Sequence, residues 1–282
     1  MENKKVKIEY SSKAERIKKI VAKTYMYLIL FLMYLPILVL IIYSFTDSDQ
    51  LGIWNGFSFN LYIALFKNKP LMNATKNTLI IAVVSAVIST IIGTLGAIGV
   101  YYSRRKYKKV VETMTQLPVV NAEIVMALSL ALVFKLLNTS YSFLTLLIGH
   151  VVLTVAFVYL NVKPKLVQMD QNIYEAALDL GATPMHALWK VVIPEIMPGI
   201  FSGFLISITL SLDDFVITQY LKEPSFETIS TYIQKIVAKH PIPAEVRALS
   251  TILFVIVLSV VVGITIYNNK QAIKKSNMRR GK

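Results

Sequence analysis

The chain has 282 residues, of which 55% are hydrophobic and only 16% are charged, and it contains no cysteine. A soluble domain carries charge on about a quarter of its residues, so this composition excludes a disulfide-stapled secreted module and argues against a soluble enzyme. The formal net charge of +14 suits either a nucleic-acid partner or a membrane protein with basic loops, and the position of the charges decides between them.

Six apolar segments reach or approach the ~20 residues that a helix needs to cross a ~30 Å hydrocarbon layer. They cover residues 24–45, 77–101, 117–137, 142–161, 199–220 and 249–267. Helices satisfy every backbone N–H and C=O group in lipid, and these runs lack the alternation of barrel strands. The first is too long for a signal-peptide core, so we expect it to be retained. The sequence therefore predicts an all-α polytopic membrane protein with its transmembrane domain over residues 24–268.

Basic residues predict the orientation of this domain. Of the 30 Lys and Arg residues, 22 lie in four places: the tail 1–23, the loop after the second segment, the loop 162–198 and the tail 269–282. Basic residues stay on the cytoplasmic side of a membrane, so both termini are expected to be cytoplasmic. The charge then follows from topology, and no nucleic-acid partner is expected.

Small residues recur at every fourth position in the second segment, at Ser85, Ser89, Gly93 and Ala97. Gly199 and Gly203 repeat this spacing at the start of the fifth segment. Small residues at this spacing let helix backbones approach closely in a bilayer. We expect this face to pack inside the chain, and the alternative is a face for a partner subunit.

The long loop 162–198 is predicted to begin with a short helix over residues 170–180. Its apolar stripe comprises Ile173, Ala176, Ala177 and Leu180. Gly181 follows directly, at the place where a glycine in the left-handed conformation commonly ends a helix. We therefore expect a sharp corner at this glycine.

A second short helix is expected after the corner. Thr183 is a favourable N-cap, and Pro184 suits the first helical position. Pro194 is expected to end this helix because proline cannot continue the hydrogen-bond ladder. A helix, a corner and a second helix make a shape that fits the groove of a partner protein.

This loop resembles the EAA loop of binding-protein-dependent ABC importer permeases. The family pattern is EAA, three residues, Gly, nine residues and Ile-x-Leu-Pro, and this chain has Glu175-Ala176-Ala177, Gly181 and Val191-Val192-Ile193-Pro194. Only aliphatic exchanges at Val191 and Ile193 depart from it. The resemblance implies a type I ABC importer permease fold, in which this loop docks on a separate cytoplasmic ATPase subunit.

Other stretches extend the resemblance over most of the chain. Residues 54–79 are similar to the stretch before the second span of these permeases, and residues 118–134 and 211–221 resemble the spermidine/putrescine permease subunits. Ala122 and Ala127 depart from the Pro and Gly that are frequent in that family. The resemblance implies polyamine transport by alternating access across a bacterial inner membrane.

The same resemblance implies the partners. They are a second, heterologous permease subunit, two ATPase subunits that hold ATP-Mg, and an extracytoplasmic solute-binding protein. Another solute, such as an iron chelate, an opine or a peptide, is the nearest alternative. A secondary transporter that uses intramembrane carboxylates is a further one.

Acidic residues within the apolar segments are candidates for the substrate path. Asp213 and Asp214 follow an uncharged run of thirteen residues, 200–212, which places them roughly 20 Å along the helix. Each carboxylate costs ~2.5–3.5 kcal/mol at the centre of a lipid-exposed helix, so such residues face a path or a partner charge. We expect one of them to contact polyamine ammonium groups while its neighbour binds a helix or caps a helix break, and the alternative is a structural role for both. For Glu123, near the start of the third segment, a helix-terminal hydrogen bond and a substrate contact both remain open.

The sequence carries no sign of catalysis. It has no GxxxxGK[ST] phosphate-binding motif, so ATP hydrolysis is assigned to another polypeptide. His150, His186 and His240 lack metal-ligand spacing and are expected to be structural. We therefore expect neither a cofactor on this chain nor an enzyme.

Overall fold

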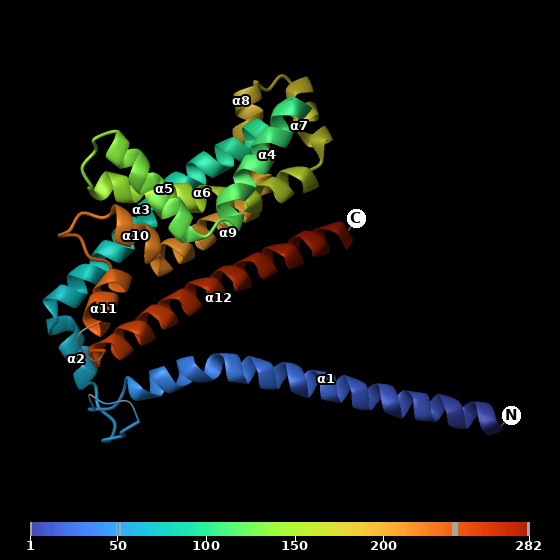
Figure 1. Cartoon of the computed structure of the whole chain (residues 1–282). Helices are drawn as coiled ribbons and strands as arrows, with labels where there is room; N and C mark the ends of the chain where they lie inside the picture. The colour runs from blue at the N-terminus through green and yellow to red at the C-terminus, as the bar shows by residue number, and fades with distance from the viewer. Residues whose placement is uncertain (1, 49, 51, 239–241, 281–282) are drawn as a thin grey trace. The chain divides into compact units, whose positions relative to one another are not determined.

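The computed structural model describes residues 2–48, 50, 52–238 and 242–280. Apart from an isolated bridge between Thr46 and Phe57, the regular elements within these ranges are helices (Figure 1). The chain divides into two compact units, Met1–Lys67 with Pro243–Lys282, and Asn68–Ile242. The fold is therefore all-α, as the sequence predicts.

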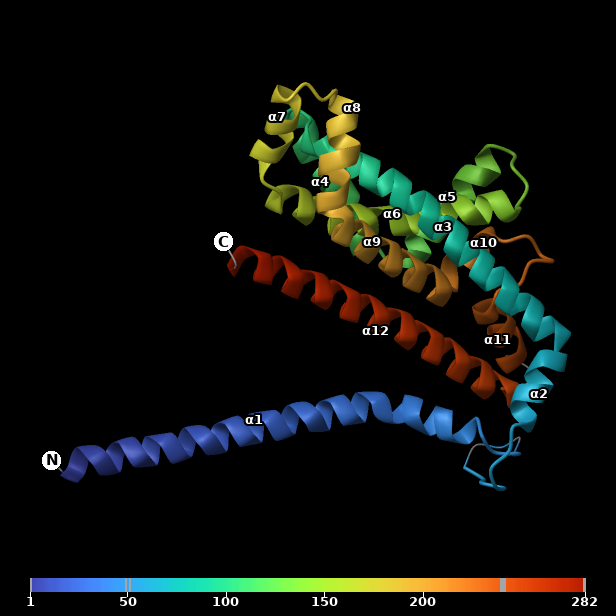
Figure 2. The same ribbon diagram turned by 180° about the vertical axis from the view of Figure 1, so that it is seen from behind.

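The unit that holds both chain ends is built from α1 (Glu2–Tyr43), α2 (Asn60–Lys67) and α12 (Glu245–Arg280). Helix α12 packs on α2 and α1. The buried Arg247 guanidinium donates to the carbonyl oxygens of Ser48 at 3.0 Å and Tyr43 at 3.5 Å, which ties the end of α1 to the start of α12. Both views show α1 and α12 running away from α2 toward the chain ends (Figures 1 and 2).

The expected segment 249–267 lies within α12, and the segment 24–45 lies within α1 except for Ser44 and Phe45, which form a turn after the helix. Each helix also continues into its neighbouring basic tail, so the tail 1–23 is helical from Glu2 and the tail 269–282 is helical to Arg280. Residues 1, 281 and 282 lie outside the described part of the chain.

The second unit has a core of three long helices, α3 (Lys69–Tyr101), α6 (Phe143–Gln168) and α9 (Ile193–Asp213). They meet at Val158. A Cβ atom on Gly93 would lie 2.7 Å from the Val158 Cβ, and one on Gly203 would lie 3.0 Å from the Val158 Cα. The absence of a side chain at both glycines thus allows α3 and α9 to approach α6.

The face of small residues predicted in the second segment packs inside the chain, as we expect. Its members Ser85, Ser89, Gly93 and Ala97 are all buried. Ser85 donates to the Ser211 hydroxyl of α9 at 3.1 Å, and the hydroxyls of Ser89 and Thr154 of α6 lie 2.6 Å apart. These hydrogen bonds join helices whose backbones are already close.

The third predicted segment, 117–137, is not one continuous helix. Helix α4 (Arg105–Val120) and α5 (Glu123–Leu136) are bent by 108° relative to each other. Asn121 and Ala122 both have extended backbone, with ψ of 144° and 135°, so they redirect the chain. Pro118 in the last turn of α4 has no N–H to donate, which weakens the helix just before the break.

The fifth predicted segment, 199–220, begins earlier and ends sooner than expected. One continuous helix runs over Pro184–Asp213, through α8 (Pro184–Ala187), a π-helical turn (Leu188–Val192) and α9. The chain then breaks, and a short helix α10 (Val216–Leu221) follows. Two further short helices are α7 (Gln171–Asp179) and α11 (Ile229–Val237).

The expectation that Pro194 ends the second loop helix is wrong. The helix passes through this residue, which lies in the first turn of α9. In the preceding π-helical turn the Ile193 N–H donates to the Leu188 carbonyl, five residues back. The wider turn accommodates the proline, which has no N–H of its own to place.

Among the described residues, five helices are long and apolar enough to cross a membrane, and the bent pair α4 and α5 brings the number to six if it forms one span. The five are Glu15–Tyr43, Lys69–Tyr101, Phe143–Gln168, Pro184–Asp213 and Glu245–Gly263. This agrees with the polytopic membrane fold predicted from the sequence.

A matched pair of glycines on α3 tests the close packing at Val158. Gly93→Ala places a methyl group against Val158 and should lower the free energy of unfolding by about 1–3 kcal/mol. Gly96→Ala is the control, because no atom lies within 4 Å of its added Cβ. Thermal unfolding of the detergent-purified chain measures both, and equal midpoints would contradict the packing.

Candidate functional site

The corner in the loop 162–198 has the geometry that its sequence predicts. Helix α7 starts at Asp170, whose carboxylate accepts from the Asn172 N–H at 3.0 Å. It ends at Asp179, and Gly181, which follows the C-cap Leu180, has φ of +87°. The Gly181 N–H donates to the Leu178 carbonyl at 2.9 Å, and the Ala182 N–H donates to the Ala177 carbonyl at 3.1 Å. These two bonds form a Schellman motif.

The helix after the corner starts as expected. The Thr183 side chain accepts from the His186 N–H at 3.3 Å, and Pro184 occupies the first helical position. Tyr174 of α7 and Leu188 pack against one buried cluster that includes Val192 and Ile196. The corner is thus held against the end of the long helix.

The outer side of this loop is apolar and exposed. The exposed fractions are 48% for Ile173, 89% for Leu180, 64% for Met185 and 62% for Trp189. Glu175 and Ala176 are exposed beside them, and Ala177 is half-buried. Most of the apolar stripe predicted on α7 therefore points away from the chain's own core.

A second candidate site lies at the other end of the same helix, where the two aspartates have different environments. Asp214 is buried, and its carboxylate accepts from the N–H groups of Ile217 at 3.1 Å and Thr218 at 2.8 Å. The Thr218 hydroxyl donates to it at 2.7 Å. Asp214 therefore caps α10, whereas Asp213 is exposed.

Glu123 is the third acidic residue at this site, and we call Asp213, Asp214 and Glu123 the acidic group. It occupies the first position of α5, directly after the break between α4 and α5. It is exposed, and it interacts electrostatically with both Asp214 and Asp213. Helix α10 packs against α5, so the two helices that follow the breaks contact each other. Broken helices are a common way in which transporters place polar groups at membrane depth.

Sequence reasoning missed a buried polar network behind Asp214. His150 of α6 is fully buried, with its Nδ1 2.7 Å from the Ser211 hydroxyl and its Nε2 3.0 Å from the Thr218 hydroxyl. The same Nε2 lies 3.5 Å from the Asp214 carboxylate. The available signal was a lone histidine in an apolar run, for which a structural role was expected.

The candidate residues thus form two groups rather than one. Glu175, Ala176, Ala177, Gly181, Thr183 and Pro184 lie at the corner, with Pro194 further along the same helix. Asp213, Asp214 and Glu123 lie at the helix breaks. Within the described residues, no group of three His, Asp or Glu side chains is arranged to hold a metal ion.

The likeness to known proteins decides the family. The model of a family described as the binding-protein-dependent transport system inner membrane component matches residues 89–275, which is more than half of the chain. The chain belongs to this family. It is a permease component of a transport system in the inner membrane, and both groups of candidate residues lie within the matched range.

Curated relatives cover most of the chain. This chain is 38% identical over 231 residues to the spermidine/putrescine transport system permease protein PotC of Escherichia coli (strain K12). The aligned residues cover 82% of this chain and 87% of that relative. The PotC protein of Haemophilus influenzae is 36% identical over 239 residues, 84% of this chain and 92% of the relative. The putrescine transport system permease protein PotI of Escherichia coli is 34% identical over 228 residues, 78% of this chain and 81% of the relative.

Solved structures share the fold. A chain of a bacterial ABC transporter that imports the acidic polysaccharide alginate matches with a TM-score of 0.68 at 21% identity, over 86% of this chain and 94% of that chain. A chain of an amino acid ABC transporter matches with a TM-score of 0.57 at 17% identity, over 74% and 98%. The all-α architecture of this permease is therefore that of ABC transporter chains.

The buried network around His150 can be tested by its contribution to stability. His150→Ala removes the two buried hydrogen bonds that its ring nitrogens form with the Ser211 and Thr218 hydroxyls, so the free energy of unfolding should fall by about 1–3 kcal/mol. His186→Ala replaces an exposed histidine and should leave the unfolding midpoint of the purified permease within error. Equal effects of the two substitutions would contradict a structural role for the network.

Proposed function

We propose that this permease is a transmembrane subunit of an ATP-driven importer and forms the translocation path for polyamines of the spermidine and putrescine class. The proposal rests on one observation above all. Exposed Asp213 and Glu123 lie at two helix breaks and interact electrostatically, in a chain that is 38% identical to a spermidine/putrescine permease. A polyamine carries separated ammonium groups on an apolar tether, and carboxylates in a water-filled path compensate such charges.

In the proposal, the three carboxylates have different roles. The Asp214 carboxylate accepts hydrogen bonds from α10 and lies beside His150, so it positions the break between α9 and α10. Asp213 is the neighbour that is left exposed for a passing ammonium group, and Glu123, at the start of α5, supplies a second charge. Spacing the acids over two helix breaks suits a substrate whose charges are also spaced.

The corner of the loop 162–198 supplies coupling to ATP hydrolysis. In the proposal, its exposed apolar face docks in a groove of a cytoplasmic ATPase subunit that holds ATP-Mg. Glu175, Ala176 and Ala177 lie on the docking helix, and Gly181, Thr183 and Pro184 set the corner. Pro194 lies in the helix that continues toward Asp213.

The assembly and its orientation follow from the same reasoning. Most basic residues lie in the tails, in the loop 104–109 and in the loop 162–198, which puts these segments and both termini in the cytoplasm. The N-terminal end of α1 and the C-terminal end of α12 both point away from α2 within their unit (Figure 1), which supports this orientation. The partners are a second permease subunit, two ATPase subunits and an extracytoplasmic binding protein. Nucleotide-driven shifts between inward-open and outward-open states then move the solute.

Gly181 tests the coupling role. Gly181→Val forces a β-branched residue into a positive-φ position, which costs ~1–2 kcal/mol and should distort the corner. We expect polyamine uptake to be lost while the chain still inserts and ATP hydrolysis no longer responds to substrate. Gly181→Asn is the matched control, because asparagine tolerates this conformation and should retain uptake. Full uptake by the valine variant would refute the role.

Asp213 tests the substrate path. Asp213→Asn removes a charged contact that is worth ~1.5–3 kcal/mol, so uptake of radiolabelled spermidine should fall on the order of tenfold or more. Asp213→Glu keeps the charge and should retain more uptake than the asparagine variant. A pull-down of the complex in parallel measures assembly. Equal losses of uptake and assembly would mean that Asp213 is structural.

A further inference from the structure

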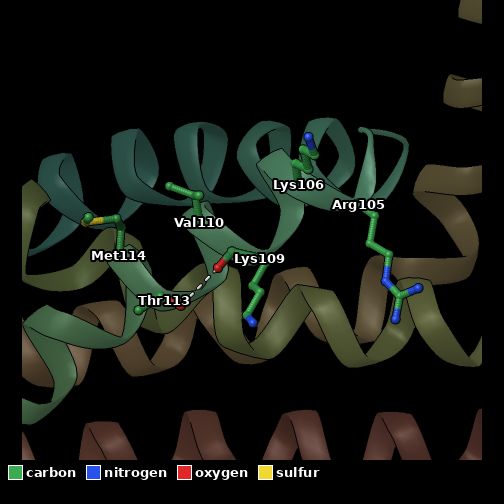
Figure 3. A pocket seen from close by; sticks show the side chains of 6 residues that line it. All are labelled: Arg105, Lys106, Lys109, Val110, Thr113 and Met114. Carbon is green, nitrogen blue, oxygen red and sulfur yellow. Dashed lines mark hydrogen bonds between the residues drawn. The ribbon is translucent and has the colours of Figure 1, made fainter.

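One surface of α4 combines positive charge with apolar side chains and lines a hollow (Figure 3). The hollow has a volume of about 760 Å³ and is lined by Arg105, Lys106, Lys109, Val110, Thr113 and Met114. We call these six residues the α4 face. None of them takes part in the coupling corner or in the acidic group.

The α4 face has an ordered layout along the helix. Lys106, Val110 and Met114 are spaced by four residues and form one stripe, which is charged at its start and apolar at its end. Arg105 and Lys109 begin the neighbouring stripe. At 1.5 Å per residue, the cationic and apolar ends of the first stripe lie roughly 12 Å apart. This layout matches a ligand with an anionic head and an apolar tail.

The opposite side of α4 attaches it to the rest of the permease. Glu112 forms an ion pair of 2.7 Å with Lys163 of α6, and the Lys108 ammonium lies 5.5 Å from the centre of the Tyr101 ring of α3. No residue of α4 is buried, and Val110 and Met114 are 57% and 59% exposed. Within the described part of the chain, no ion pair involves the three cations of the α4 face. Their charges are therefore available to an external anion.

We propose that the α4 face binds an anionic phospholipid of the cytoplasmic leaflet. The phosphate lies against Arg105, Lys106 and Lys109, and an acyl chain runs along Val110 and Met114. The inference rests on the orientation given under the proposed function, which puts the start of α4 at the cytoplasmic surface. There a Lys or Arg near anionic lipid contributes ~1 kcal/mol, and the apolar end adds burial in the acyl region.

An acidic protein surface would also meet the charges, but it would not use the apolar end. The apolar residues continue beyond the hollow to Leu117 and Val120, which are 50% and 82% exposed. This is the pattern of an amphipathic helix that enters a leaflet from its surface. Charge and apolar area together therefore favour a lipid as the occupant.

Lipid titration followed by native mass spectrometry tests the proposal on the full chain purified in detergent. The parent should bind dioleoyl phosphatidylglycerol more tightly than dioleoyl phosphatidylcholine. The triple variant R105Q/K106Q/K109Q should bind phosphatidylglycerol roughly tenfold or more weakly, because three charges are lost. The triple variant R16Q/K18Q/K19Q removes the same charges from exposed positions of the basic tail and should keep the parent's affinity.

A second variant separates a lipid from a free anion. V110S/M114S keeps all charges, so it should weaken phosphatidylglycerol binding and leave binding of soluble glycerol phosphate unchanged. Unchanged phosphatidylglycerol affinity in R105Q/K106Q/K109Q would overturn the proposal, and so would an equal loss in the tail variant. If R105Q/K106Q/K109Q leaves lipid binding intact and instead releases the ATPase subunits from the assembled transporter, the α4 face binds a protein and the proposal is overturned. Because the readout is lipid binding, it is independent of which solute the permease carries.

Discussion

The close approach of three helices at Val158 is the constraint on which the rest of this permease depends. Gly93 and Gly203 bring the backbones of α3 and α9 against that one side chain of α6, at distances that a Cβ atom would prevent. The hydrogen bonds from Ser85 to Ser211 and between Ser89 and Thr154 form because the helices are already this close. In lipid, where apolar burial gives little driving force between helices, such packing and hydrogen bonding carry the association.

The same packing explains why a buried carboxylate is tolerated beside an exposed one. Asp214 receives hydrogen bonds from two backbone N–H groups and the Thr218 hydroxyl, and His150 lies behind them. With these donors its charge is compensated inside the protein. Asp213, one residue earlier, has no place in this network and faces outward. Two adjacent aspartates therefore have distinct physical roles.

Features that depend on local chemistry could be predicted from the sequence. Gly181 at positive φ, the Thr183 cap and the small residues on α3 follow from rules that act over a few residues. A helix break capped by one of the two aspartates is among the expectations, but the positions of the breaks could not be predicted, because they depend on distant partners. The break after Asp213 is stabilised by Asp214 contacts with α10 and by His150, more than sixty residues earlier in the chain. The passage through Pro194 depends on a π-helical turn, which hydropathy does not reveal.

The continuous helix Pro184–Asp213 begins at the corner that Gly181 forms and ends at the acidic group. Its 30 residues make a stiff rod of about 45 Å. A rod of this kind cannot be displaced at one end alone, because a tilt of only a few degrees about Val158 swings both ends in opposite directions. The π-helical turn and Pro198, which has no N–H to donate, interrupt its regular hydrogen bonding. Mechanical work delivered at Thr183 would thus reach Asp213 as a change of position rather than be absorbed by bending along the way.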